Sequence, residues 1–173
     1  MPDDREPVLQ QGSTGAHLDP AGLRAPAPST AATGEDAVAR YLAASEANDV
    51  EGLLATLARD GELVSPISTR MVFRGERDLR ILATAVYGGL RGLRWGPQIG
   101  EGRVRVAIGE ARVGPGVRLS DAMVFELDEL GRIARVRPHI RPWLGLTVFA
   151  LTLGPRMARH PGVIVRALRA GGR

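Results

Sequence analysis

The spacing of apolar residues early in the chain predicts two short amphipathic helices. A stripe at i, i+3, i+4 and i+7 runs from Val38 to Ser45, and the same spacing recurs from Val50 to Leu57. Thr33 is available as the first N-cap, with acidic residues in the turn that follows it. Asn48 can end the first helix in a left-handed conformation, and Asp49 can cap the second. A tight helical hairpin is expected.

A short strand and a third helix follow this hairpin. The segment Glu62–Ser65 alternates in polarity and places Leu63 and Ser65 on one face of a strand. After Gly75, apolar residues return at helical spacing, at positions 79, 82, 83 and 86. A helix that buries this stripe is therefore expected.

Beyond Tyr87 the pattern changes from helical to strand-like. Within Arg103–Val113, three apolar residues alternate with arginines, which predicts an antiparallel sheet with one solvated face. Helices followed by an antiparallel meander predict the α+β class. The four expected strands are Leu93–Ile99, Arg103–Val113, Val117–Leu127 and Arg132–Arg137.

Composition divides the 173 residues into three regions. Residues 1–34 are rich in Pro, Gly, Ala and Thr and are expected to be a disordered leader. Residues 35–142 form the predicted domain, and residues 143–173 a C-terminal helical extension that is rich in arginine and partly apolar. No acidic residue lies between Ile133 and the C-terminus, where eight arginines accumulate.

The residue types that are missing exclude several chemistries. The chain has no cysteine, and all 23 of its basic residues are arginine. Disulfides, thiol catalysis and lysine Schiff bases are therefore excluded. Three scattered histidines without a carboxylate cluster give no support for a metal, and no cofactor is expected. The N-terminus does not read as a signal peptide, so we expect a cytoplasmic protein.

Residues 37–66 resemble the opening of the nuclear transport factor 2-like (SnoaL-like) superfamily, in its ketosteroid isomerase branch. Phe73 with Gly75, and the segment Phe125–Ile133, resemble two later motifs of the same superfamily. The resemblance implies three N-terminal helices packed on a strongly curved, mainly antiparallel sheet. The matched residues of the opening are Arg40, Tyr41, Ala43, Ala44, Asp49, Gly52, Leu57, Asp60 and Pro66.

The resemblance also implies where a catalytic site would lie. Steroid isomerases use an aspartate base together with a tyrosine and a protonated aspartic acid that stabilise an oxyanion. Tyr41 matches the tyrosine, but Ser65 occupies the position of the base and has no useful basicity. The second oxyanion position falls on Met123, with Asp121 one pleat away on the same face. We therefore expect no steroid isomerase activity.

Two enzymatic functions are alternatives to simple binding. An epoxide hydrolase would need several inward carboxylates, and only Asp121 is expected to face inward. A cyclase, isomerase or hydrolase acting on an apolar polycyclic or polyketide substrate could work with Asp121 or His139 as acid or base. In the alternative without catalysis, Asp121 forms an ion pair with an arginine such as Arg137, and His139 has a structural role.

The leading hypothesis is a protein that binds an apolar or amphipathic small molecule or dimerises, without steroid isomerase activity; if it is an enzyme, acid–base chemistry without a metal is expected. The candidate catalytic residues are Tyr41, Asp121 and His139. A homodimer is the expected assembly, and nucleic acid is disfavoured as a partner because stacking aromatics are lacking. A second alternative is peripheral contact with an anionic membrane through Arg156, Arg159, Arg166 and Arg169. The expected pocket-lining residues are Tyr41, Ser65, Phe73, Trp95, Met123 and Phe125.

Overall fold

The computed structural model describes residues 36–172, so the leader expected over residues 1–34 lies outside the described range. Helix α1 (Ala37–Ala47) begins after Asp36, whose side chain accepts a hydrogen bond from the Val38 amide at 3.0 Å. The cap is therefore Asp36 and not Thr33, because the carboxylate reaches the free amide two residues ahead of it. Asn48 ends α1 in the left-handed conformation with φ 56°, as predicted.

Asp49 caps helix α2 (Val50–Ala55), also as predicted, by accepting a hydrogen bond from the Gly52 amide at 2.9 Å. The chain then enters a sheet of seven strands in the order β2-β1-β6-β5-β4-β3, with β7 paired to β5. Only β1 and β6 pair in parallel. The strands are β1 (Leu57–Val64), β2 (Val72–Arg74), β3 (Leu90–Ile99), β4 (Val104–Val113), β5 (Val117–Leu127), β6 (Ile133–Arg137) and β7 (Ile140–Arg141).

Strand β4 buries the face opposite to the one that its sequence indicates. The small residues at positions 107, 109 and 111 are buried, whereas Val104 and Ile108 are about half exposed. The reason is the ring of Trp95, which lies across Gly109: a Cβ atom on Gly109 would lie 2.6 Å from that ring. Small side chains are needed inside, so the β-branched residues point outward.

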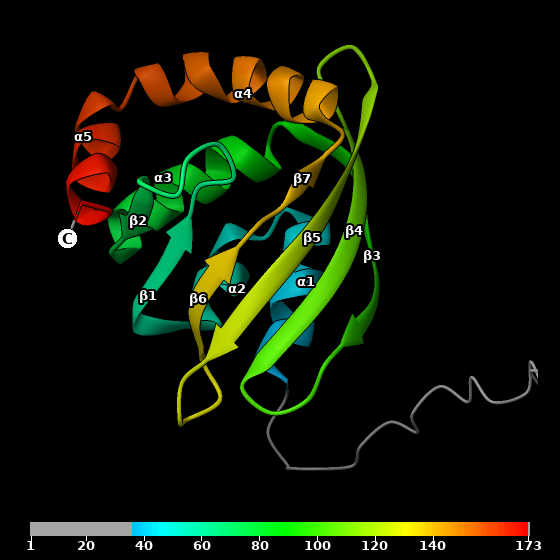
Figure 1. Cartoon of the computed structure of the whole chain (residues 1–173), viewed down its shortest axis with the longest axis vertical. Coiled ribbons are helices and arrows are strands. Elements are labelled where there is room, and N and C mark those ends of the chain that lie inside the picture. The colour runs from blue at the N-terminus through cyan, green and yellow to red at the C-terminus, as the bar shows by residue number, and fades with distance from the viewer. Residues whose placement is uncertain (1–35, 173) are drawn as a thin grey trace, which may run out of the picture. The chain divides into compact units, whose positions relative to one another are not determined.

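Three further helices complete the fold. Helix α3 (Glu76–Tyr87) packs beside α2, and α4 (Trp143–Ala158) crosses from β5 and β7 to α3. Helix α5 (Pro161–Ala170) lies against β2. Figure 1 shows α4 lying across one end of the layer formed by the sheet and the first helices. The expected C-terminal extension thus packs onto the domain and belongs to the same compact unit, Gly34–Arg173.

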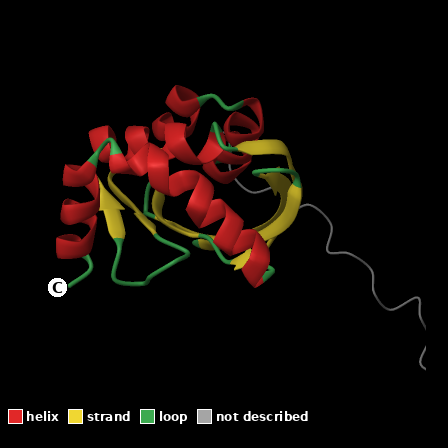
Figure 2. Cartoon of the chain, turned by 90° about the horizontal axis from the view of Figure 1, so that it is seen from above, coloured by secondary structure: helices red, strands yellow, loops and turns green. Residues whose placement is uncertain are grey.

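The α+β class and the curved, mixed sheet are confirmed. The strands bend into a wall, and the helices lie along its open side (Figure 2). The largest buried side chains include Tyr41, Phe125 and Ile133, which join α1 to the concave face of the sheet. A second buried cluster around Phe73, Leu82, Met157 and Val163 fastens α4 and α5 to α3. This packing leaves a cavity between the sheet and the helices.

Candidate functional site

The cavity has a volume of about 170 Å³ and almost wholly apolar walls. Strands β1, β5 and β7 supply one wall and helices α1, α2 and α3 the other. Helix α4 covers it with Phe149, Leu153 and Met157, and α5 adds Ile164. An apolar cavity of about 150 Å³ holds one benzene ring, and most ligand pockets are larger, at about 300–1,000 Å³. A cavity of this volume therefore suits a small ring system.

Two tyrosines form a polar pair in this apolar space. Tyr41 lies on the buried stripe of α1, and Tyr87 is the last residue of α3. Their hydroxyl oxygens are 2.9 Å apart, and either hydroxyl can be the donor. One of the two phenolic protons is used in that bond, so the other is available to a third oxygen. Burial raises the pKa of both tyrosines, and the charge of nearby Asp121 raises it further, so both remain protonated donors.

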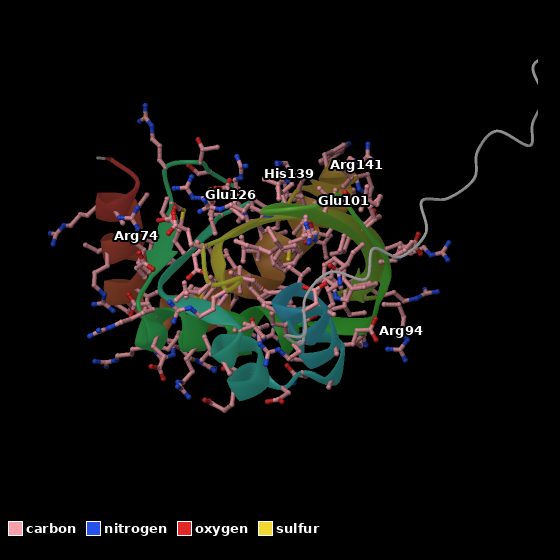
Figure 3. The ribbon with its side chains drawn as sticks, turned by 90° about the horizontal axis from the view of Figure 1, so that it is seen from below. Arg74, Arg94, Glu101, Glu126, His139 and Arg141 are labelled. Atoms are coloured by element: carbon pink, nitrogen blue, oxygen red, sulfur yellow. The ribbon has the colours of Figure 1, made fainter. Side chains whose placement is uncertain are left out.

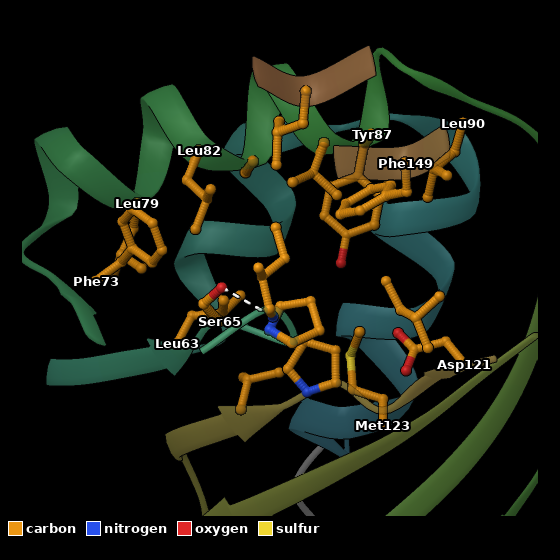
Figure 4. Close-up of a pocket in the computed structure, with 18 of the residues that line it drawn as sticks. Leu63, Ser65, Phe73, Leu79, Leu82, Tyr87, Leu90, Asp121, Met123 and Phe149 are labelled. Atoms are coloured by element: carbon orange, nitrogen blue, oxygen red, sulfur yellow. Dashed lines mark hydrogen bonds between the residues drawn. The ribbon is translucent and has the colours of Figure 1, made fainter. Parts of the chain in front are cut away.

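Asp121 completes the polar cluster. Its side chain points into the cavity because β5 alternates, which brings residues 119, 121 and 123 to the concave face. Figure 4 shows the Asp121 carboxylate and the Tyr87 hydroxyl directed into the same space. Only 8% of Asp121 is exposed, and burial raises the pKa of its carboxyl from 3.8 to about 6. Asp121 therefore changes charge close to neutral pH.

Asp121 is held by the backbone and not by an arginine. Its Oδ1 accepts a hydrogen bond from the His139 amide at 2.8 Å. The expected partner, Arg137, instead pairs with Glu126 at 2.6 Å on the outer face of the sheet. Arg137 points outward because its cross-strand partner is Val124, which lies on the opposite face from Asp121. No charge compensates Asp121 from that side, which leaves the carboxyl free to bind or to exchange a proton.

His139 lies elsewhere than a catalytic role would require. Its ring is exposed, and Nδ1 lies 3.1 Å from the backbone oxygens of Ala122 and Arg137. Figure 3 shows the side chain on the outside of the curved sheet. His139 acts on the site through its backbone amide, which donates to Asp121, and through its charge, and both lower the pKa of the Asp121 carboxyl.

Ser65 lines the cavity, but its hydroxyl is occupied in a turn. The side chain is 7% exposed, and its Oγ accepts a hydrogen bond from the Ile67 amide at 3.2 Å. The Ser65 amide donates to the backbone oxygen of Met71 at 2.9 Å. Figure 4 shows Ser65 on the far side of the cavity from Asp121. Ser65 thus shapes the loop between β1 and β2.

The remaining expected pocket residues divide into two groups. Phe73, Trp95 and Met123 line the cavity together with Tyr41 and Ser65. Phe125 lies in the core behind the wall, fully buried, with its ring centroid 5.2 Å from that of Tyr41 in an edge-to-face arrangement. It supports the position of the Tyr41 ring.

Three features near the site were not expected from the sequence. Tyr87 extends the stripe of the third helix by one turn, at i+4 from Ala83, and this spacing could have revealed it. The covering role of α4 had only the run Trp143–Leu153 as its signal. Glu62 was also not expected to be buried; it lies on the outer face of β1, opposite Arg74 and Arg135. It is occupied by cross-strand ion pairs with Arg74 at 2.6 Å and with Arg135, and therefore ties three strands together.

Two of the four arginines proposed for membrane contact are engaged within the fold. Arg166 forms two hydrogen bonds with Asp78, at 2.6 and 2.7 Å, which join α5 to α3 and hold the pKa of Asp78 below its ordinary value. Arg156 donates to the backbone oxygen of Thr152. Arg159 and Arg169 are exposed. Within residues 36–172, no three metal-binding side chains gather and no helix is long and apolar enough to cross a bilayer.

Comparisons by sequence found nothing: no family model matches the chain, and no curated protein matches it. Solved structures do match. An uncharacterized protein with a cystatin-like fold from Silicibacter pomeroyi aligns with a TM-score of 0.69 and 18% identity, over 76% of this chain and 93% of its own. A steroid delta-isomerase from Pseudomonas aeruginosa aligns with a TM-score of 0.64 and 24% identity, over 76% of this chain and 99% of its own.

A third match carries the name of the fold that the sequence motifs indicated. An NTF2-like protein of unknown function from Cytophaga hutchinsonii aligns with a TM-score of 0.52 and 14% identity, over 67% of this chain and 96% of its own. At these identities the likeness is one of fold. The chain therefore adopts the nuclear transport factor 2-like cone fold that residues 37–66 predicted.

Proposed function

We propose that this protein binds a small, largely apolar molecule that carries one hydrogen-bonding oxygen. The observation that supports this most directly is the cluster of Tyr41, Tyr87 and Asp121 in an otherwise apolar cavity. Apolar walls with a few placed polar groups are typical of small-molecule sites. The walls provide affinity, and the cluster fixes the end of the ligand that carries the oxygen.

The protonation of Asp121 decides which oxygen is preferred. When ionised, the carboxylate accepts a hydrogen bond from a ligand hydroxyl, while the free tyrosine proton donates to the same oxygen. When protonated, the carboxyl is a donor and favours a carbonyl oxygen instead. Because the pKa is about 6, hydroxyl ligands are expected to bind better above that pH and carbonyl ligands below it.

Steroid isomerase activity is not part of the proposal. That reaction needs a base which moves a proton across the substrate, and the sequence resemblance matches that position to Ser65, whose Oγ accepts a hydrogen bond from the Ile67 amide. The similarity to the steroid delta-isomerase is a similarity of fold, and its reaction is not proposed for this chain.

Binding is tested with a matched pair of probes, 2-naphthol and naphthalene, which differ by one hydroxyl. Calorimetry is expected to show 2-naphthol bound roughly tenfold more tightly above pH 6, since a hydrogen bond to a charged group contributes about 1.5–3 kcal/mol. The difference should disappear in Asp121→Asn and shrink in Tyr87→Phe, while naphthalene binding stays unchanged. Equal affinities of the two probes for the wild-type protein would rule out the proposed role of the cluster.

A second candidate function is acid–base catalysis by Asp121 on an apolar carbonyl substrate, in an isomerisation, a cyclisation or a hydrolysis. The observation that favours it is a buried carboxyl with a pKa of about 6 beside a hydroxyl that can stabilise an oxyanion. A single proton acceptor is enough for proton removal next to a carbonyl.

This candidate is tested without knowing the substrate. Exchange of the α-protons of 2-tetralone in D₂O, followed by NMR, should be accelerated by the wild-type protein with an inflection near pH 6. Asp121→Asn should abolish the acceleration, and Ser65→Ala should keep it. Exchange at the buffer rate with wild-type protein, under conditions where 2-naphthol binds, would leave the protein as a binder alone.

A further inference from the structure

Helix α4 exposes an apolar, uncharged face to solvent. Its exposed residues follow one side of the helix at i, i+4 and i+8, and the fully described helix carries no charged residue on that side. Trp143 is 76% exposed and Leu151 is 70% exposed. The residues of this face are Trp143, Leu144, Thr147, Leu151, Gly154, Pro155 and Ala158.

A helix that is apolar on all sides is normally covered on all sides. The inner side of α4 is covered, because Phe149, Leu153 and Met157 face the cavity. Its outer side is bare in the described part of the chain. The outer face of α4 therefore requires a partner of low polarity.

A cluster of arginines lies at the same end of the fold. Arg91 and Arg112 are direct cross-strand partners, and so are Arg112 and Arg118, on the outer face of β3, β4 and β5. Arg141 faces the same way, because it is paired with Ser120 next to Arg118. Like charges placed directly opposite each other destabilise a sheet. The cluster costs folding free energy, which an anionic partner would offset.

Within residues 36–172 the outward arginines of this cluster form no ion pair, and Glu110, one pleat from Arg112 on the same face of β4, is the nearest acidic residue along that strand. The side chains of Arg112, Arg118 and Arg141 are exposed, and none of them forms an ion pair with a described carboxylate. The guanidinium of Arg91 donates to the backbone oxygen of Gly114, at the tip of the hairpin between β4 and β5. Figure 3 shows Arg141 pointing outward from the curved sheet.

The apolar face and the arginine cluster are neighbours in space. The hairpin packs on α4, since a Cβ atom on Gly114 would lie 2.8 Å from Val148 of that helix. Figure 1 shows the β4–β5 hairpin and α4 at one end of the folded unit. An apolar helix face with an interfacial tryptophan, bordered by arginines, is the arrangement of a helix that lies in the plane of an anionic lipid surface.

We propose that the end of the fold formed by the outer face of α4 and by Arg112, Arg118 and Arg141 docks on an anionic phospholipid bilayer. The helix lies flat at the headgroup level with Trp143 and Leu151 inserted, and the arginines contact lipid phosphates. All three arginines differ from the four expected from the sequence, two of which, Arg156 and Arg166, form hydrogen bonds to Thr152 and Asp78.

The test is co-sedimentation with vesicles of phosphatidylcholine mixed with phosphatidylglycerol, compared with phosphatidylcholine alone. Wild-type protein should bind the anionic vesicles, and binding should weaken with salt. Leu151→Glu should weaken it at least about tenfold, and Arg112→Ala with Arg118→Ala roughly thirtyfold, since each arginine near the surface contributes about a factor of five.

Matched controls lie at the opposite end of the sheet. Leu130→Glu changes charge at a residue that is 77% exposed in the turn between β5 and β6, and Arg59→Ala with Arg103→Ala removes two exposed arginines. Both controls should bind vesicles as the wild type does. Tryptophan fluorescence should shift to shorter wavelength on binding, and Trp143→Phe should lose this shift. The emission of Trp95, whose Nε1 donates a hydrogen bond to Ser45, should not change.

Four outcomes would overturn the proposal. The first is equal binding to neutral and anionic vesicles, and the second is unchanged vesicle binding by Leu151→Glu. The third is self-association without lipid that Leu151→Glu abolishes. The fourth is arginine-dependent binding of a DNA duplex without binding of vesicles. The third outcome would assign the face to a second copy, and the fourth would assign the cluster to nucleic acid.

Discussion

Asp121 combines features that rarely occur together in a residue kept only for structure. It is buried, its one backbone hydrogen bond leaves the second carboxylate oxygen free, and its charge acts on the pKa of Tyr41 and Tyr87. Burying a carboxylate without an opposite charge costs stability. The fold tolerates this cost at the point where the cavity needs a polar group.

That cost makes stability depend on pH. The folded-state pKa of Asp121 is about 6, compared with 3.8 in the unfolded chain, so the folded protein holds the proton more tightly. Stability from this group is therefore highest below the unfolded pKa and falls as the pH rises through 6. Asn keeps an oxygen for the His139 amide but has no charge to desolvate.

We expect Asp121→Asn to gain stability over the wild type as the pH rises. The difference in unfolding free energy should grow by about 2.5 kcal/mol between about pH 4 and about pH 8. Urea denaturation of both proteins across this range measures it. A difference that does not vary with pH would show that Asp121 titrates normally.

At the scale of elements, α4 is the part that decides whether the cavity is open. It approaches β5 closely because Gly145 is buried at the crossing: a Cβ atom there would lie 3.0 Å from the Cβ of Leu119 and 3.1 Å from the backbone oxygen of Arg118. Gly154, further along the same helix, has no atom within 4 Å of such a Cβ. The two glycines allow a matched comparison.

Gly145→Leu is expected to lift α4 from β5, because the backbone oxygen of Arg118 cannot move aside. Hydrogen exchange in α4 should become at least about tenfold faster while β4 and β5 stay protected. Gly154→Leu should leave exchange unchanged or slower, since it replaces glycine in a helix with a better helix former. Equal exchange in the two variants would mean that the contact at Gly145 does not hold α4.

At the scale of the whole molecule, the outer face of the sheet carries an apolar strip. Ile99, Val104 and Ile108 are each about half exposed, and Val106 and Val124 continue the strip. Acidic and basic residues border this strip on the same face: the acidic ones are Glu110 and Glu126, and the basic ones are Arg112 and Arg137. A self-complementary surface of this kind suits a two-fold contact with a second copy, which we propose as the homodimer interface.

Sedimentation equilibrium should then show a wild-type mass near twice the 18.4 kDa of one chain. Ile108→Glu should shift the mass toward that of a single chain, because it buries an unpaired charge in the strip. Leu130→Glu provides the control with the same change of charge. A wild-type monomer at high concentration would exclude this interface.

The sequence alone determined the class of the fold and most of its local structure. Asn48 and Asp49 end and begin helices through their own side chains and backbones, which local spacing reveals. The same locality let the motifs of residues 37–66 predict the cone fold. Tyr41 was placed at the site because a helical stripe fixes which side chains face inward.

Only the tertiary structure decided which groups meet. The inward face of β4 depends on the Trp95 ring from another strand, so the alternation of valine and arginine pointed to the wrong face. Tyr87, the partner of Tyr41, is 46 residues away in the sequence, and the His139 amide that binds Asp121 is 18 residues away. Local sequence periodicity cannot predict contacts at such separations. The ion pair of Arg166 with Asp78 joins two helices that are far apart in the sequence, so no local pattern could predict it. Long-range packing, and not propensity, placed α4 over the cavity.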